Sequence, residues 1–254
     1  MAQECAVNHA VTIFGDNEGG FATDVEMIRL NLMFVMSKMH LRLNAYPRWN
    51  DDVRVDTWFA VQGKLAARRD WMLYSADGSG DAPMAAATST WLLVNTETRK
   101  LGRVPADRVE EYKKLSPTEP LQALDADEEK LPAVPSPEDE GARADFGGLL
   151  ERRGLRVRRT DVDMNRHVNN VAYVRWLLET VPAERWAKYE LCALTLEFRN
   201  ECHLDDEVDS FVSAREKLGA VAGEEGEEAL YHWLKLSGEG GKELMRAKTF
   251  WRAR

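Results

Sequence analysis

The chain has 254 residues, a formal net charge of −9 at pH 7 and 44% hydrophobic residues, a composition typical of a globular protein with one large or two small domains. The acidic balance disfavours a nucleic-acid-binding protein, which needs a basic surface. The apolar runs are far shorter than the ~20 residues that span a bilayer, so we expect no membrane span. The cysteines, Cys5, Cys192 and Cys202, are odd in number and lack a Cys-x-x-Cys pair, which disfavours a disulfide framework and a zinc ribbon.

The first part of the chain predicts one helix followed by strands. Residues 6–14 are expected to be helical, and residues 28–36 predict a strand that is buried largely on both faces. Further strands are expected at residues 53–61, 69–75 and 85–95, with Asp77-Gly78 as a hairpin turn. The amino terminus has neither the apolar core of a secretory signal nor an Arg- and Ser-rich leader, so we expect no transit peptide in this chain.

Residues 116–148 differ from the regions on either side. Prolines and the acidic clusters 125–129 and 138–140 dominate this segment. Such a composition buries too little apolar area to fold alone, so we expect a solvated linker that is extended where prolines are dense. An acidic interaction tail is the alternative, but it is disfavoured because residues with the pattern of a folded domain follow the segment. The linker therefore separates two expected domains, residues 1–115 and 149–254.

The two expected domains resemble each other. Residues 55–59 and 208–212 both follow an acidic turn. Both begin with Val-Asp and a hydroxyl residue and end with two apolar residues, which differ between the two segments. Residues 87–91 and 247–251 both begin with Ala and end with Trp. Because the pairs occur in the same order at similar separations, they predict a duplicated unit.

The second domain repeats the order of helix and strands. Apolar residues recur at helical spacing within residues 169–180. Strands are expected at residues 193–199, 207–217, 229–237 and 244–252, with glycine-rich turns at 223–226 and 238–241. One helix followed by antiparallel strands is an α+β pattern. We therefore predict a tandem double hotdog, in which each copy is a helix wrapped by a curved antiparallel sheet.

Residues 160–170 form the densest polar cluster of the chain, directly before the second helix. Asp163, Asn165 and His167 alternate there, and alternate side chains of an extended segment project to the same side. We therefore expect a carboxylate, an amide and an imidazole to converge. His167 is the natural water activator near neutral pH.

The start of the second helix extends this candidate site. Asn169 or Asn170 is expected to cap the helix, whose first backbone N–H groups and positive dipole end can polarise a carbonyl or hold an oxyanion. The same residues also fit an N-capping loop with hydrogen-bonded polar side chains and no chemistry. Both interpretations stay open on these residues alone.

Two further candidates follow the strand expected at residues 193–199. Glu201 is a second carboxylate that we expect beside His167, although spacing does not prove that placement. Cys202 adjoins it, and a Cys-His-Asn set is a known route to acyl transfer. A cysteine at a strand end also fits inert packing.

Residues 163–179 resemble the active-site stretch of the acyl-acyl carrier protein (acyl-ACP) thioesterases of plant and algal plastids. Further segments resemble the same family, in the family order and over almost the whole chain outside the linker: residues 20–23, 46–51, 68–71, 194–202 and 247–252. The resemblance implies a double-hotdog thioesterase that ends fatty acid synthesis by hydrolysing acyl-ACP.

This resemblance also implies the residues that act. Family catalytic roles fall on Asp163, Asn165, His167 and Glu201, and Cys202 takes the place of the nucleophile in an alternative thiol mechanism. Whether Asp163 attacks directly or orients a water molecule stays open. No cofactor and no metal are implied.

The same resemblance gives expectations for the rest of the protein. Residues 1–115 are expected to shape the acyl pocket and residues 149–254 to carry the catalytic set. Family members have a transit peptide and a first strand ahead of the first helix, so the first hotdog is expected to be truncated at its amino terminus. The expected location is the plastid stroma, and the expected partner is acyl carrier protein (ACP) bearing a fatty acyl chain. We expect no nucleic-acid partner, and either a monomer or a homodimer.

Two alternatives to this function remain. A hotdog acyl-CoA thioesterase would use the same site with a different carrier, and an acyl-binding module would hold the chain without cleaving it. A docking surface for the acidic ACP has to be local in so acidic a chain. The best candidate patch is Arg152, Arg153, Arg156, Arg158 and Arg159, and a smaller one is Arg99, Lys100 and Arg103.

Overall fold

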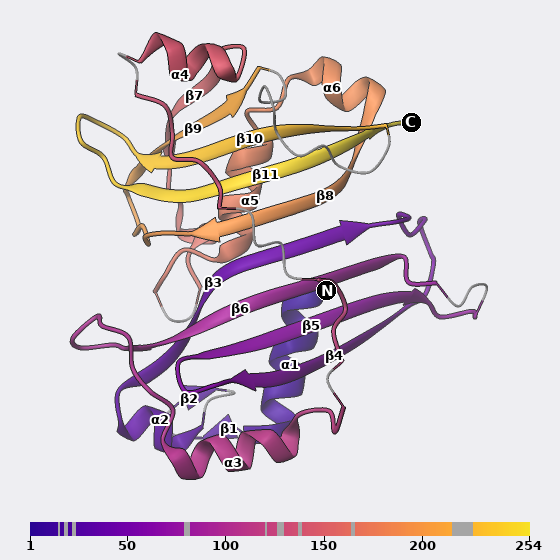
Figure 1. The fold of residues 1–254 in the computed structure, drawn as a ribbon, viewed down its shortest axis with the longest axis vertical. Helices are drawn as coiled ribbons and strands as arrows, with labels where there is room; N and C mark the ends of the chain where they lie inside the picture. The colour runs from indigo at the N-terminus through magenta and orange to yellow at the C-terminus, as the bar shows by residue number, and fades with distance from the viewer. Residues whose placement is uncertain are drawn as a thin grey trace. The chain divides into compact units, whose positions relative to one another are not determined.

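A computed structural model gives the fold (Figure 1) and describes all residues except 15, 18–19, 22–23, 79–81, 120, 126–129, 137–138, 164–165 and 215–225, together with the side chains of 16–17 and 20–21. The chain forms two compact units, Met1–Asp127 (unit 1) and Glu128–Arg254 (unit 2). Both units combine helices with an antiparallel sheet, which confirms the predicted α+β class. No helix in the described part of the chain is long and apolar enough to cross a membrane.

Unit 1 is a helix lying across an antiparallel sheet of order β4-β5-β6-β3. Its elements are α1 (Ala2–Phe14), β1 (Asp16–Asn17), β2 (Gly20–Phe21), α2 (Val25–Arg29), β3 (Leu32–Leu43), β4 (Val53–Gln62), β5 (Ala66–Ser75), β6 (Ala85–Asn95) and α3 (Ala106–Leu115). Polar side chains of β5 hold α1 in place. The indole Nε1 of Trp71 donates to the carbonyl of Ala2 at 3.0 Å, and Nη1 of Arg69 lies 3.0 Å from Nδ1 of His9.

Unit 2 has the same plan, with strand order β8-β11-β10-β9-β7. Its elements are α4 (Glu140–Asp145), β7 (Leu149–Arg156), the 3₁₀ helix η1 (Arg159–Asp161), α5 (Asn170–Leu178), α6 (Ala183–Lys188), β8 (Tyr189–Phe198), β9 (Glu207–Ser213), β10 (Glu227–Leu236) and β11 (Glu243–Ala253). The buried side of α5, which includes Tyr173, Trp176 and Leu177, faces the sheet. Ser210 Oγ of β9 donates to the carbonyl of Trp176 at 3.0 Å.

The internal duplication predicted from the sequence corresponds to equivalent strands. Residues 55–59 lie in β4 and residues 208–212 in β9, while residues 87–91 lie in β6 and 247–251 in β11. Each of the latter two ends in an indole bonded to the hydroxyl two residues earlier: Trp91 Nε1 donates to Ser89 Oγ at 2.7 Å, and Trp251 Nε1 donates to Thr249 Oγ1 at 2.8 Å. Among the described residues of unit 1, no strand takes the place that β7 has in unit 2.

The strand predicted at residues 28–36 is wrong in its first part. Asp24 Oδ1 accepts the backbone N–H of Glu26 at 2.8 Å and caps α2, so residues 25–29 are helical. Asn31 then has a φ of 53°, and β3 begins at Leu32. The residues of β3 are partly buried throughout, on both faces of the strand. A capping aspartate outweighed the alternating pattern because it satisfies an otherwise unpaired helix-start N–H.

Parts of residues 116–148 pack against the two sheets. Leu131 and Phe146 are buried in a cluster with side chains of β9 and β10, so the prediction of a solvated segment is wrong for these two residues. A phenylalanine buried in this way contributes about 2 kcal/mol. The limits 1–115, 116–148 and 149–254, and the functions assigned to them, stay predictions.

Backbone carbonyls of this segment receive bonds from both units in the same way. In unit 1, Trp58 Nε1 donates to the carbonyl of Leu121 at 2.9 Å. In unit 2, Trp233 Nε1 donates to the carbonyl of Pro132 and Arg246 Nη1 to that of Leu131, both at 2.8 Å. These donors satisfy three carbonyls that would otherwise need water, and so they attach residues 121 and 131–132 to the sheets.

Candidate active site

A tight loop precedes α5 and carries two of the predicted site residues. Val162 and Val168 pair as an antiparallel bridge, and the backbone N–H of Asp163 donates to the carbonyl of His167 at 2.8 Å. Arg166 has a φ of 62°, a left-handed conformation that costs a non-glycine residue about 1 kcal/mol. Such a conformation persists where the surrounding contacts hold the loop in place. The prediction of an extended segment with alternating side chains is therefore wrong. Asn165 lies outside the described residues.

The structure brings His167 and Glu201 together. Nδ1 of His167 lies 2.8 Å from Oε2 of Glu201, and both side chains are about one-third exposed. Asp163 is joined to the same histidine through its backbone, because Oδ1 of Asp163 accepts the N–H of His167 at 3.2 Å. A carboxylate at Nδ1 keeps the proton on that nitrogen and leaves Nε2 as a base. The arrangement can therefore withdraw a proton from a water molecule.

Strand pairing places Glu201. Residues 199–201 leave the end of β8, where Phe198 pairs with Met245 of β11. The backbone N–H groups of Arg199 and Asn200 both donate to the carbonyl of Leu244, at 2.9 and 3.3 Å. The position of the Glu201 carboxylate thus depends on the β8–β11 register, which no local sequence pattern reports.

Cys202 points away from solvent into the unit. It is fully buried, its Sγ donates to the hydroxyl of Tyr173 at 3.3 Å, and the same hydroxyl accepts the backbone N–H of Cys202 at 3.1 Å. Burial raises the pKa of the Cys202 thiol to about 11. A thiol of that pKa is protonated at neutral pH, and the thiolate is the nucleophilic form.

Asp161 is a site residue that the sequence reasoning missed. Its side chain is almost fully buried and forms an ion pair with Arg175 of α5. Its Oδ2 also accepts the backbone N–H of Arg158 at 2.9 Å, and its carbonyl accepts the N–H of Asn169 at 2.8 Å. Asp161 therefore fixes both ends of the loop to α5. The sequence signal for this ion pair was the acidic Asp161 in the polar cluster, followed by Arg175 on the expected helix.

The start of α5 is capped as predicted. Oδ1 of Asn169 accepts the backbone N–H of Val171 at 2.9 Å. The helix dipole is positive at this end, directly after His167 in the chain. A developing negative charge on a bound carbonyl oxygen would be stabilised there.

His203 lies beside the His167–Glu201 pair and was not a predicted site residue. One ligand atom from each of His167, Glu201 and His203 lies within 4.8 Å of the others, so among the described residues these three can hold a metal ion. The rings of His167 and His203 are 6.3 Å apart between centroids.

Three arginines of the predicted basic patch lie on β7, and each forms an ion pair with a carboxylate. Arg152 pairs with Glu179 at 2.8 Å, Arg153 with Glu151 at 2.9 Å, and Arg156 with Asp205 at 2.8 Å. The arginine side chains remain more than half exposed. Because exposed pairs are weak, these guanidinium groups can exchange partners at little cost.

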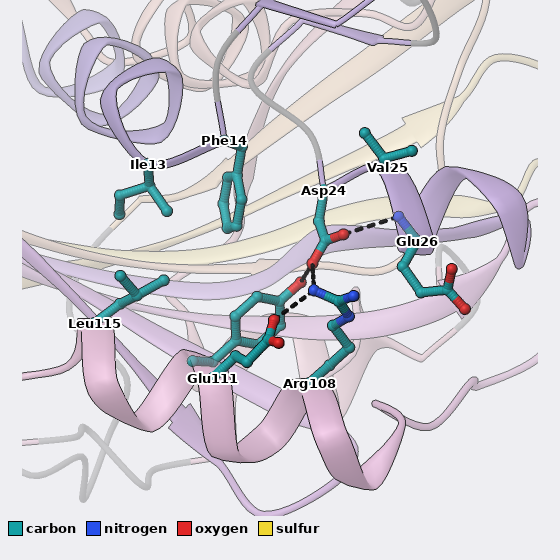
Figure 2. A pocket seen from close by; sticks show the side chains of 9 residues that line it. Ile13, Phe14, Asp24, Val25, Glu26, Arg108, Glu111 and Leu115 are labelled. Carbon is teal, nitrogen blue, oxygen red and sulfur yellow. Dashed lines mark hydrogen bonds and ion pairs between the residues drawn. The ribbon is translucent and has the colours of Figure 1, made fainter.

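A cavity of about 420 Å³ lies in unit 1, lined by residues of α1, the start of α2 and α3 (Figure 2). The hydroxyl of Tyr112 donates to Oδ2 of Asp24 at 2.8 Å, and Nη1 of Arg108 lies 3.8 Å from that oxygen and also pairs with Glu111. Figure 2 shows Arg108 directed toward Asp24, beside apolar side chains such as Phe14. An acyl chain requires a mostly apolar lining, so the acyl pocket expected in residues 1–115 stays a prediction.

Comparisons with known proteins identify relatives over both units. Residues 1–112 match the family model of the acyl-ACP thioesterase N-terminal domain, and residues 150–253 match that of the acyl-ACP thioesterase C-terminal domain. A protein of Arabidopsis thaliana named oleoyl-acyl carrier protein thioesterase 1, chloroplastic, is 37% identical over 260 residues, which cover 99% of this chain and 69% of the relative.

Solved structures agree with the fold. The 12:0-ACP thioesterase from Umbellularia californica superposes with a TM-score of 0.80 at 29% identity, covering 100% of this chain and 87% of that one. A Mycobacterium tuberculosis protein described as having a double hotdog fold superposes with a TM-score of 0.52 at 12% identity, covering 99% and 92%. At that identity the likeness concerns the fold alone, and it confirms the predicted double hotdog.

Proposed function

The chain belongs to the acyl-ACP thioesterase family, and on that premise we propose that it hydrolyses the thioester of acyl-ACP to a free fatty acid and holo-ACP, which ends fatty acid synthesis. The observation that carries this proposal beyond family membership is the 2.8 Å contact between Nδ1 of His167 and Oε2 of Glu201 at the start of α5. A histidine oriented by a carboxylate is a general base suited to activating water.

In the proposed mechanism, Glu201 accepts a hydrogen bond from the Nδ1–H of His167, and Nε2 takes a proton from water as the water oxygen attacks the thioester carbonyl carbon. The tetrahedral intermediate then expels the carrier's thiolate by breaking the C–S bond, and the imidazolium returns the proton to that sulfur. Glu201 stabilises the imidazolium between these steps. The positive end of α5 stabilises the oxyanion.

Asp163 and Asn165 keep supporting roles in this proposal. The Asp163 carboxylate holds the backbone of His167 and lies in the same loop, so we assign it the orientation of the loop and of the water molecule. Direct attack by Asp163 would form an acyl anhydride, and single-turnover hydrolysis in ¹⁸O-water separates the two routes. Label in the Asp163 carboxylate after one turnover indicates an anhydride opened at that carbon. Label only in the fatty acid, with no acyl-enzyme detected by mass spectrometry, supports direct attack by water.

Cys202 is not the nucleophile in this proposal. Its thiol is buried, bonded to Tyr173 and raised in pKa to about 11. A nucleophilic cysteine needs the opposite, a pKa lowered by nearby positive charge and some exposure. The observed surroundings support a packing role for this residue.

Family membership supports a proposal for the carrier and for the location, but not for the acyl length. An acyl chain on ACP is the proposed substrate, and the plastid stroma is the proposed location because the Arabidopsis relative is named chloroplastic. The relatives differ in their named acyl groups, oleoyl in one and 12:0 in the other. Chain-length profiling of fatty acids released in a host that expresses this chain decides the preferred length.

One assay tests the reaction and the carrier together. The purified chain is incubated with an acyl-ACP and with the acyl-CoA of the same acyl group, and the released thiol is measured. We expect thiol release with a higher kcat/KM for acyl-ACP. A preference for acyl-CoA would favour the alternative carrier, and tight acyl-ACP binding without thiol release would favour an acyl-binding module.

A further inference from the structure

His203 is a histidine at the candidate active site that the proposed hydrolysis does not use. It follows Glu201 and Cys202 in the chain, outside β8, and its side chain is 61% exposed. One ligand atom of His203 lies within 4.8 Å of ligand atoms of both His167 and Glu201. Two imidazoles and one carboxylate are a known donor set of zinc sites that keep a fourth position open to solvent.

The spacing of these groups suits a small divalent ion. Ligands about 2.0 to 2.1 Å from a tetrahedral Zn²⁺ lie roughly 3.3 Å from each other. Nδ1 of His167 and Oε2 of Glu201 are 2.8 Å apart, so an ion between them requires a separation of only a few tenths of an ångström. His203 has further to move, and its side chain is exposed.

Two hydrogen bonds with Asp206 hold the turn that carries His203. Oδ2 of Asp206 accepts the backbone N–H of His203 at 2.8 Å and lies 3.9 Å from Nδ1 of its ring. The N–H of Asp206 donates to the carbonyl of His203 at 3.2 Å. Metal-binding histidines are commonly supported by a nearby carboxylate, and Asp206 is the carboxylate near His203.

We propose that His167, Glu201 and His203 bind a zinc ion that reversibly inhibits this enzyme. The inhibition rests on the proposed function, because it requires His167 and Glu201 to be the base and its partner. A zinc ion on Nδ1 of His167 and on the Glu201 carboxylate replaces the Nδ1 proton. The neutral ring then carries its proton on Nε2, which removes the lone pair that takes a proton from water. Borderline-soft ions such as Zn²⁺ and Co²⁺ fit this donor set, whereas Mg²⁺ prefers oxygen ligands and does not.

The experiment measures binding and activity separately. Protein freed of metal with a chelator is titrated with Zn²⁺ by calorimetry, and hydrolysis is followed by fatty acid released at free Zn²⁺ concentrations set by nitrilotriacetate. Fatty acid is measured because the released thiol would itself bind zinc. The variants are His203→Gln, which removes one ligand outside the proposed catalytic set, and His40→Gln in β3 as the matched control.

We expect the metal-free enzyme to be fully active, and Zn²⁺ but not Mg²⁺ to inhibit it. His203→Gln should keep the wild-type rate without zinc and need at least ~10-fold more free Zn²⁺ for half inhibition, with the same loss in the calorimetric affinity. His40→Gln should behave like the wild type in both measurements.

Three results would overturn the inference: equal zinc affinity in wild type and His203→Gln, inhibition that His40→Gln relieves as strongly, or activity that disappears with the chelator and returns with zinc. Calorimetry keeps the test independent of the proposed function. If acyl-ACP is not hydrolysed at all, zinc binding that depends on His203 still supports the site, while the proposed function fails on its own assay.

Discussion

Each unit places a histidine against a charged side chain, but the charges are opposite. In unit 1, Nη1 of Arg69 lies 3.0 Å from Nδ1 of His9, and burial together with Arg69 lowers the pKa of His9. In unit 2, Oε2 of Glu201 lies 2.8 Å from Nδ1 of His167. A guanidinium donates to Nδ1 and occupies its lone pair, whereas a carboxylate accepts the Nδ1 proton and leaves Nε2 basic and oriented.

The difference teaches that a repeated fold does not repeat the chemistry. Both units have a helix across equivalent strands, and both show the indole-to-hydroxyl bond two residues apart. The partner of the histidine decides what the histidine can do. An imidazole beside a buried arginine is held neutral and serves as a hydrogen-bond acceptor, which fits the expectation that residues 1–115 lack the catalytic set.

Removing each histidine is the strongest way to break this comparison. We expect His167→Ala to lower kcat/KM for acyl-ACP by at least ~100-fold, because a general base contributes at least that much. His9→Gln retains an acceptor for Arg69 and should stay within ~3-fold of wild type. Steady-state kinetics with circular dichroism as the folding control checks both. Near-normal hydrolysis by folded His167→Ala, or a comparable loss in His9→Gln, would contradict the assignment.

Glu201 and Cys202 give the next largest expected contrast. Glu201→Gln keeps the shape but cannot hold the imidazolium, so we expect a loss of at least ~10-fold in kcat. Cys202→Ser retains a donor to Tyr173 and should keep most activity, within ~3-fold of wild type. The measurement is kcat for both variants, with mass spectrometry of the intact protein during turnover. An acyl adduct on Cys202 would reverse the assignment.

The two units also differ in the titration of a buried basic side chain, Arg69 in unit 1 and His232 in unit 2. Burial lowers the pKa of Arg69 in unit 1 to about 10, so it stays charged at neutral pH. Burial lowers the pKa of His232 in unit 2 to about 3, from an ordinary value of 6.5, and its Nε2 lies 2.7 Å from Oγ1 of Thr249. His232 is therefore neutral when folded but takes up a proton below pH 6.5 when unfolded.

The free energy of unfolding should accordingly fall as the pH drops from about 6.5 toward 3, by about 1 kcal/mol per pH unit from this residue. His232→Gln keeps a bond to Thr249 and should remove that share of the slope, although it lowers stability at pH 8. Urea unfolding at pH 5, 6, 7 and 8 measures the slope. The same slope in both proteins would show that His232 is not the group that titrates.

The smallest expected effect concerns the basic patches of the two units. Arg152→Glu with Arg156→Glu should raise KM for acyl-ACP by ~3-fold, and the effect should weaken with salt because these exposed arginines act by long-range attraction. The existing pairs with Glu179 and Asp205 limit it. Reversal of Arg99 and Lys100 in unit 1 is the comparison and should do less. Equal losses on a short carrier-free thioester would mean that the arginines support the fold.

Local patterns predicted elements well where one signal dominated. Residues 85–95 match β6, and the helix expected at residues 169–180 contains α5, because caps and periodicity act within a few residues. Residues 28–36 failed because the Asp24 cap and an apolar alternation conflict there. In the site, the polar cluster around His167 was visible locally, but its loop geometry and the role of Asp161 were not.

The sequence alone determined one helix and most strands of each unit, the duplication and the residue types available for chemistry, because these depend on spacing along the chain. It did not predict α2, α3, α6 or β7. The tertiary structure decided the partners. The β8–β11 register set Glu201 against Nδ1 of His167 and left Cys202 buried against Tyr173. Glu201 and Cys202 are neighbours in the chain but have different surroundings, one partly exposed beside His167 and the other buried against Tyr173, and only tertiary packing decides this.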